Sequence, residues 1–129
     1  MAFAVQLSQN LPPVINNELL PFDTVAVNLG GGFDLQSSHF VAPVAGIYQI
    51  NVTLRGNGYT AFHVLVNGSV FVVLFTSDTD MVTASTLISL TVGDNVWVET
   101  RGSSVYGSGD SHCSTKTCHF SGILIHQAL

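Results

Sequence analysis

The segment "FTSDTDMVT" holds two aspartates, Asp78 and Asp80, with one residue between them. This is the spacing of a cation site. Alternate carboxylates on a loop can point at one ion, and Ca²⁺ prefers such hard oxygen ligands, with carbonyl groups and water completing its shell. A solvated acidic loop is the alternative interpretation. Calcium is therefore a candidate ligand of this segment, and the sequence requires no cofactor.

Both cysteines lie in the segment "HCSTKTCH", residues 112–119. Cys113 and Cys118 are spaced for a small disulfide loop, and free thiols are one alternative. A zinc cluster that adds His112 and His119 is another. Because adjacent residues of a strand point to opposite faces, Cys118 and His119 are poorly placed to share one tetrahedral ion. We therefore expect a disulfide, which fits an oxidising compartment.

Two segments rich in Gly, Ser and Asn, 55–60 ("RGNGYT") and 101–112 ("RGSSVYGSGDSH"), are typical of loops. Loops on a rigid scaffold are where binding residues usually lie. Tyr59 and Tyr106 are candidates for stacking on a sugar ring, and Asp110 with its neighbours supplies hydrogen bonds to sugar hydroxyl groups. The alternative is that both tyrosines pack at the ends of the fold or at a subunit interface.

Catalysis has little support in the sequence. Five histidines and several serines could supply a base and a nucleophile, but no G-x-S-x-G elbow is present. We therefore interpret the histidines as surface or strand residues and expect no enzyme.

The charge excludes two classes of partner. Three Lys and Arg stand against eight Asp and Glu, which gives a formal net charge of −5. The basic residues are scattered, so one subunit offers no basic patch for nucleic acid or for an anionic membrane. No apolar run is long enough for a transmembrane helix, so we expect no membrane insertion. The start "MAFAVQLSQNLPP" lacks the features of a signal peptide, whereas sequons at Asn51 and Asn67 are compatible with secretion.

A period of two marks the strands that must hold these loops. In "FVAPVAGIYQINVTL", residues 40–54, the even positions from Tyr48 to Leu54 are apolar and the odd ones are polar. This pattern indicates a strand with one buried face. No segment has the period of a helix, so the chain is interpreted as all-β.

Turn signals divide the remaining strands. Residues 61–76 form two apolar runs joined at Asn67-Gly68, a strong hairpin signal. Residues 86–92 and 95–101 are two further strand-like segments joined by a turn at Gly93-Asp94, and we interpret them as the two arms of a second hairpin. With the N-terminal segments this gives about eight to ten strands, the number and spacing of a sandwich or jelly roll.

One strand, "VFVVLF" at residues 70–75, is apolar on both faces. Such a strand is either central in the sandwich or covered by another subunit. Charged residues make up only 9% of the chain, against about 25% in a typical soluble domain. The two observations together favour a homo-oligomer, with Phe71, Val73 and Phe75 as its interface.

The order of aromatic, Asn and Gly residues in the first half of the chain resembles the signature of the globular C1q domain. The segments "GGGFD", "HFVAPVAGIY", "LTVGDNVWV" (90–98) and "FSGILI" (120–125) are similar to that family's segments and follow in the same order. Ile50 and Val52 depart from the family's aromatics, but both are apolar and on the core side. The signature residues are Phe22, Asn28, Phe33, Phe40, Gly46 and Tyr48.

This resemblance implies one C1q-like domain over 1–129, with its signature in 22–54 and a C-terminal strand at 118–127. It implies a ten-stranded jelly roll like that of tumour necrosis factor, secreted, homotrimeric and used for recognition. Some members bind calcium through Asp residues in the loop that here holds Asp78 and Asp80. No collagen-like stretch is present, so we expect a free-standing or excised head.

Two functions follow as expectations. The first is a secreted, lectin-like pattern-recognition protein of innate immunity, which binds carbohydrate or another microbial surface ligand as a homotrimer. The alternative is a structural or signalling head that binds a protein receptor or trimerises a longer chain, and it predicts an exposed apolar or aromatic patch on the outer surface.

Overall fold

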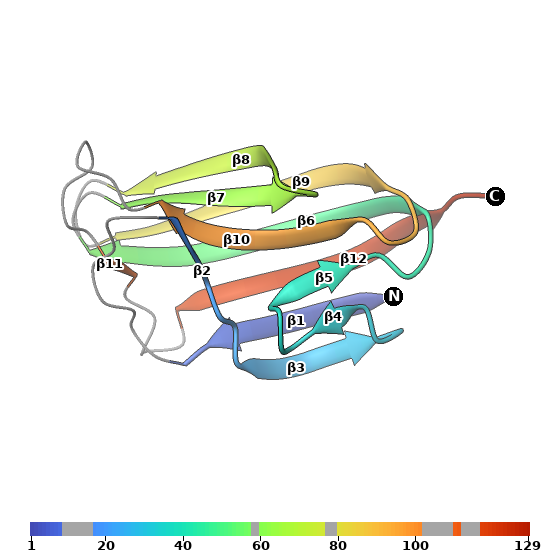
Figure 1. Ribbon diagram of the computed structural model, residues 1–129, viewed down its shortest axis with the longest axis horizontal. Helices are drawn as coiled ribbons and strands as arrows, with labels where there is room; N and C mark the ends of the chain where they lie inside the picture. The colour runs from blue at the N-terminus through green and yellow to red at the C-terminus, as the bar shows by residue number, and fades with distance from the viewer. Residues whose placement is uncertain (9–16, 58–59, 77–79, 102–109, 112–116) are drawn as a thin grey trace.

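The computed structural model describes residues 1–8, 17–57, 60–76, 80–101, 110–111 and 117–129 (Figure 1). These residues form twelve strands, two more than the expected ten, because short pairings such as β4 and β11 leave no periodic signal. Among them there is no helix, and so none that could span a membrane. The strands are β1 (Ala2–Leu7), β2 (Asn17–Leu19), β3 (Thr24–Leu29), β4 (Phe33–Asp34), β5 (His39–Val41), β6 (Gly46–Asn57), β7 (Thr60–Val66), β8 (Ser69–Thr76), β9 (Asp80–Leu90), β10 (Asn95–Arg101), β11 (Asp110–Ser111) and β12 (Cys118–Gln127).

The strands form two six-stranded antiparallel sheets packed face to face as a jelly roll, which confirms the predicted fold (Figure 1). In sheet 1, β9 pairs with one side of β6. The short strand β11 and the long strand β12 pair with different stretches of the opposite side, and β1 and β3 follow β12. Sheet 2 has the order β4–β5–β10–β7–β8, and β2 pairs with the end of β10. Strand β8 is therefore an edge strand. The predicted C-terminal strand, 118–127, is β12.

The alternation predicted for residues 48–54 is confirmed in β6. Tyr48, Ile50, Val52 and Leu54 are all buried between the sheets, and the residues between them are half-buried on the outer face. Because β6 pairs with β9 along its whole length and with β12 over most of it, this strand fixes the middle of sheet 1.

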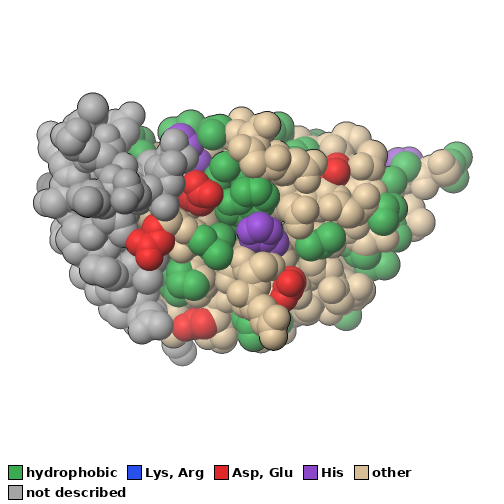
Figure 2. Space-filling view, viewed as in Figure 1, with side chains coloured by type: hydrophobic (Ala, Val, Ile, Leu, Met, Phe, Trp, Pro, Cys, Tyr) green, Lys and Arg blue, Asp and Glu red, His purple; other side chains and the backbone are tan. Residues whose placement is uncertain are grey.

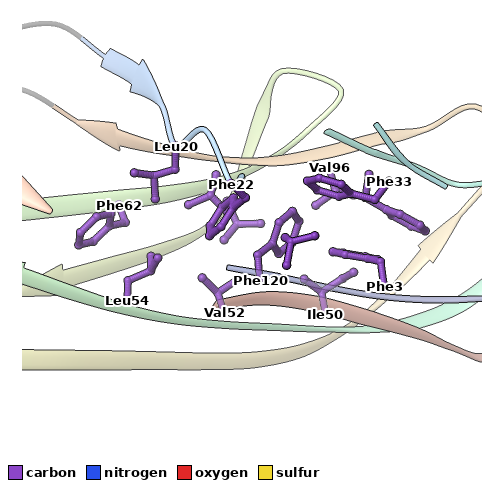
Figure 3. Close-up of a cluster of buried hydrophobic side chains, with 14 of the residues drawn as sticks. Phe3, Leu20, Phe22, Phe33, Ile50, Val52, Leu54, Phe62, Val96 and Phe120 are labelled. Carbon is purple, nitrogen blue, oxygen red and sulfur yellow. The ribbon is translucent and has the colours of Figure 1, made fainter. Parts of the chain in front are cut away.

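Aromatic rings fill the core (Figure 3). The Phe3 ring stacks on Phe40 at 4.4 Å between centroids and meets Phe120 edge-on at 4.8 Å. The aromatic residues of the signature, from Phe22 to Tyr48, are all buried in this cluster. The aromatic positions of the signature are therefore positions that pack the core.

The two polar positions of the signature fix the backbone. The Asn28 side chain donates to the Phe33 carbonyl and accepts from the Phe33 N–H, both at 3.0 Å, and so closes the glycine-rich loop between β3 and β4. Gly46 is needed because a Cβ there would overlap the carbonyl oxygen of His126 and the Leu124 side chain. Larger residues at Gly46 would push β12 away from β6.

The Asn67-Gly68 hairpin is confirmed, with both residues at positive φ (52° and 89°), as a turn between twisted antiparallel strands requires. The turn at Gly93-Asp94 is also confirmed, but the expected pairing of its arms is wrong. Strand β9 belongs to sheet 1 and β10 to sheet 2, so this turn crosses between the sheets. Turn chemistry is local and does not specify which sheet the next strand joins.

Candidate functional site

Most of the predicted ligand residues lie outside the described residues: Tyr59, Asp78 and Tyr106. Asp80 and Asp110 are described through their backbones, as the first residues of β9 and β11. Asp80 pairs with Gly56 on one side of β6, and Asp110 pairs with Asn57 on the other side. The register thus brings two predicted site residues, from the calcium and the sugar hypotheses, to the same end of sheet 1.

The cysteine region supports part of the expectation. Cys118 is fully buried and His119 is half-buried, so the two side chains do point to opposite faces of β12. Within the described ranges, no cluster of three or more His, Cys, Asp or Glu side chains could hold a metal ion, and no cysteine is free. The expected partner Cys113 lies outside these ranges, so the Cys113–Cys118 disulfide stays a prediction.

Strand β8 carries a strip of exposed apolar side chains. Phe71, Val73 and Phe75 are exposed by 45%, 57% and 44%, although all three are hydrophobic. Since β8 is an edge strand, the alternative that it lies in the centre of the sandwich is wrong. We call these three residues the β8 strip.

The inner face of β8 differs from the expectation at one residue. Leu74 is buried and Val72 half-buried, but Val70, which simple alternation would place on the same face, is 48% exposed. The register between β7 and β8 shifts between Val64 and Leu65, so that one extra residue of β8 separates Val70 from Val72. A bulge reverses the alternation beyond it, which turns Val70 outward.

Among the described residues, the centre of the outer face of sheet 1 carries no charged side chain, and Arg55 lies toward one end of β6 on this face. Gln49 donates to the Ser85 hydroxyl at 3.1 Å, and that hydroxyl donates to Asn51 at 2.7 Å, across β6 and β9. Exposed Leu87 and Ile123 pair with Gln49 on its two sides, in β9 and β12. The centre of this face therefore combines satisfied amides and hydroxyls with exposed aliphatic side chains.

The outer face of sheet 2 carries an aromatic pair. The His39 ring of β5 stacks on the Trp97 ring of β10, with 4.3 Å between centroids and 7° between planes. Trp97 Nε1 donates to Glu99 Oε2 at 3.0 Å. Figure 2 shows this side of the molecule, with hydrophobic, histidine and acidic side chains next to one another and no coloured lysine or arginine.

The surroundings of His39 also affect its protonation. Partial burial lowers the pKa of His39, and this effect outweighs the raising effect of the Asn95 hydrogen bond and of the negative charges of Asp34 and Glu99. The imidazole is therefore neutral near pH 7, where it stacks on Trp97 as an uncharged ring.

Neither His39 nor Trp97 was predicted from the sequence to be a functional residue. A signal was present, because Trp97 is the one tryptophan of the chain and falls on the outward parity of "NVWVETR". A tryptophan at an outward position adds apolar area to the outer face of a strand, and contiguous apolar patches on a surface often mark interaction sites.

A profile of the C1q domain matches residues 2–125. The mouse complement C1q tumor necrosis factor-related protein 6 is 33% identical over 102 residues, which cover 75% of this chain and 39% of the mouse protein. The human complement C1q tumor necrosis factor-related protein 2 is also 33% identical, over 105 residues, which cover 76% of this chain and 35% of the human protein. The matched region thus spans little more than a third of these relatives.

Solved structures show the same fold at low identity. The globular domain of zebrafish complement 1qA superposes with a TM-score of 0.74 at 17% identity, and covers 98% of both chains. Murine APRIL superposes with a TM-score of 0.76 at 11% identity, over 96% of this chain and 98% of its own. With the profile match over nearly the whole chain, these comparisons show that the protein belongs to the C1q domain family.

Proposed function

We propose that this chain is the recognition head of a secreted, non-enzymatic homotrimer, which binds carbohydrate or another microbial surface ligand in innate immunity. The β8 strip is the observation that carries the proposal. Three exposed apolar side chains stand on β8, the last strand of sheet 2 among the described strands, and a lone soluble domain usually protects such an edge with charge, proline or a covering segment. A second copy of the chain supplies such a cover.

The outer face of sheet 1 is the surface that best fits the β8 strip. It is nearly uncharged and carries exposed Leu87 and Ile123, so covering it removes apolar area from water at little electrostatic cost. An assembly of three heads gives three equivalent sites. Weak sites joined in this way bind a repetitive surface much more tightly than one site does.

The end of the domain that holds Asp80 and Asp110 is the proposed ligand end. Tyr59 and Tyr106 are proposed to stack on sugar rings, and Asp78 with Asp80 to hold calcium. A net charge of −5 opposes a purely electrostatic grip on anionic surfaces. Neutral glycans, or acidic sugars bridged by calcium, are therefore the proposed ligands.

Light scattering in calcium and after EDTA tests the assembly, and a glycan array tests the ligand. We expect a trimer mass and specific glycan signals that fall in a Tyr59→Ala or Tyr106→Ala variant. An EDTA-sensitive trimer or array signal, lost in Asp78→Asn but not in the control Asp34→Asn, supports calcium. A monomer in both buffers contradicts the assembly, and a blank array contradicts the sugar ligand.

A receptor-binding or trimerising head is the second candidate, and the aromatic pair on sheet 2 favours it. His39 and Trp97 form an aromatic pair on an outer face, where that function predicts an aromatic patch, although the two side chains are half-buried and the prediction was of an exposed one. Aromatic residues are enriched in protein interfaces. A protein partner whose binding falls at least tenfold in Trp97→Ala, with a blank glycan array, would favour this candidate; glycan binding unchanged in Trp97→Ala would favour the lectin.

A further inference from the structure

We propose that Asn67 carries an N-linked glycan in the secreted protein, and that Asn51, in the second sequon, stays unmodified in the assembled protein. The inference rests on the secretory route of the proposed function. It concerns a covalent modification and needs no particular ligand.

The sequon Asn67-Gly68-Ser69 occupies an exposed turn. All three residues are exposed, at the tip that joins β7 to β8. A Cβ built on Gly68 meets no atom within 4 Å, so the space beside the turn is open. An N-x-S/T acceptor in a surface turn has room for a large hydrated sugar chain.

The hydrogen bonds of Asn67 are compatible with the modification. Its Nδ2 donates to Asp94 Oδ1 at 3.0 Å, and its Oδ1 accepts from the Asn95 N–H at 2.9 Å. A primary amide has two N–H groups, and N-glycosylation replaces one of them. The other N–H remains available for Asp94, so the contact between the β7–β8 and β9–β10 turns can be kept.

The transfer balances with a polyisoprenyl-diphosphate-linked oligosaccharide as the donor, acted on by a transferase of the secretory pathway. A bond forms between Asn67 Nδ2 and the anomeric carbon of the first sugar. The bond from that carbon to the diphosphate oxygen breaks, and the diphosphate leaves with the electron pair. Nδ2 gives up one proton.

Asn51 is placed differently. It lies inside β6, paired with Ser85 of β9 on one side and Ser121 of β12 on the other. Its Oδ1 accepts from the Ser85 hydroxyl, and it is half-buried in the centre of the outer face of sheet 1. A sugar there would stand on the face that the β8 strip is proposed to cover, so a chain modified at Asn51 would not assemble.

The position of Asn67 also leaves the proposed ligand end free. The β7–β8 turn lies at the opposite end of these strands from Thr60 and Thr76, and so away from the β6 end that pairs with Asp80 and Asp110 (Figure 1). A glycan on the turn can therefore coexist with a ligand at the other end.

The test is the intact mass of the full chain, secreted from animal cells behind a cleavable leader, before and after treatment with an amidase that removes N-glycans and converts Asn to Asp. We expect one glycan per chain in the trimer fraction, kept in Asn51→Gln and lost in Asn67→Gln. Ser69→Ala is the matched second variant, because it removes the sequon and leaves the Asn67 hydrogen bonds intact. We expect it to lose the glycan as well.

Two results would overturn the inference: a secreted chain of unmodified mass, or a glycan lost in Asn51→Gln and kept in Ser69→Ala. These outcomes are separate from those for the proposed function. An unmodified trimer contradicts the glycan alone, whereas a monomer modified at Asn67 contradicts the assembly and leaves the acceptor site standing.

Discussion

Replacing Phe71 or Phe75 by Ser is the most direct perturbation of the proposed assembly. Both side chains lie on edge strand β8, and each is exposed by nearly half in the single chain. If a neighbouring copy covers them, their exposed halves lose contact with water only in the trimer. The substitution should therefore weaken assembly by the transfer free energy of that exposed part.

The size of the effect follows from the exposed fraction. A buried aromatic side chain removes about 150–250 Å² from water, so the 45% exposed part of Phe71 is about 90 Å². At about 25 cal/mol per Å² this corresponds to about 2.3 kcal/mol per copy. Three copies give about 7 kcal/mol, or roughly a 10⁵-fold rise in the dissociation constant of the trimer.

The assay is molar mass by light scattering over a dilution series, with circular dichroism to show that each variant is folded. Val92→Ser is the control, because Val92 is 68% exposed in the β9–β10 turn and is not part of the β8 strip. Val73→Thr keeps the shape of the side chain and should weaken the trimer less than the Phe variants. If Phe71→Ser and Phe75→Ser remain trimers at the same dilutions as Val92→Ser, the β8 strip is not an interface.

Three further predictions test the fold around the site. Asn28→Ala removes both bonds to the Phe33 backbone, each worth about 0.5–1.5 kcal/mol, so urea unfolding should show a loss of about 2 kcal/mol, and an equal loss in the exposed control Gln36→Ala would contradict it. The pKa of His39 is lower in the folded than in the unfolded chain, so its contribution to stability is present above the unfolded value of 6.5 and is lost as the pH falls through the folded value. His39→Phe should therefore flatten the fall in unfolding free energy below about pH 6.5, and an unchanged slope would refute this. Reducing the proposed Cys113–Cys118 disulfide, counted by thiol mass labelling, should loosen only its short loop and lower the unfolding free energy by about 2 kcal/mol, because a small loop removes less chain entropy than a long one; a much larger loss, with a large fall in melting temperature, would contradict this.

The strands that the sequence predicts best are those with one buried face. Apolar and polar residues alternate strictly in 48–54, because β6 buries one face and turns the other away from the core. The same alternation of buried and half-buried residues appears from Cys118 to Phe120 at the start of β12. The Asn67-Gly68 turn was predictable because its conformation demands residues that tolerate positive φ. Strand alternation and turn conformation each depend on a few adjacent residues, which is why the sequence predicts them.

Features that depend on distant contacts were not predictable in the same way. The residues Gly93-Asp94 predict a hairpin turn, yet the strands that they join, β9 and β10, belong to different sheets. The bulge in β8 reverses Val70 relative to Val72, and no residue type at that point signals it. For the site, the sequence predicted the apolar strip but not whether β8 was central, and it did not predict that His39 would stack on Trp97.

The geometry of the exposed surfaces also bears on the number of copies. If the β8 strip packed against the same strip of another copy, the contact would be isologous and would close as a dimer. If it packs against the outer face of sheet 1, the two surfaces differ, and such a heterologous contact closes only as a ring. Every strip and every face is then covered in a closed ring, and none is left exposed to recruit further chains. A dimer mass would therefore show that the strip pairs with itself, and would leave Leu87 and Ile123 on sheet 1 without a role in assembly.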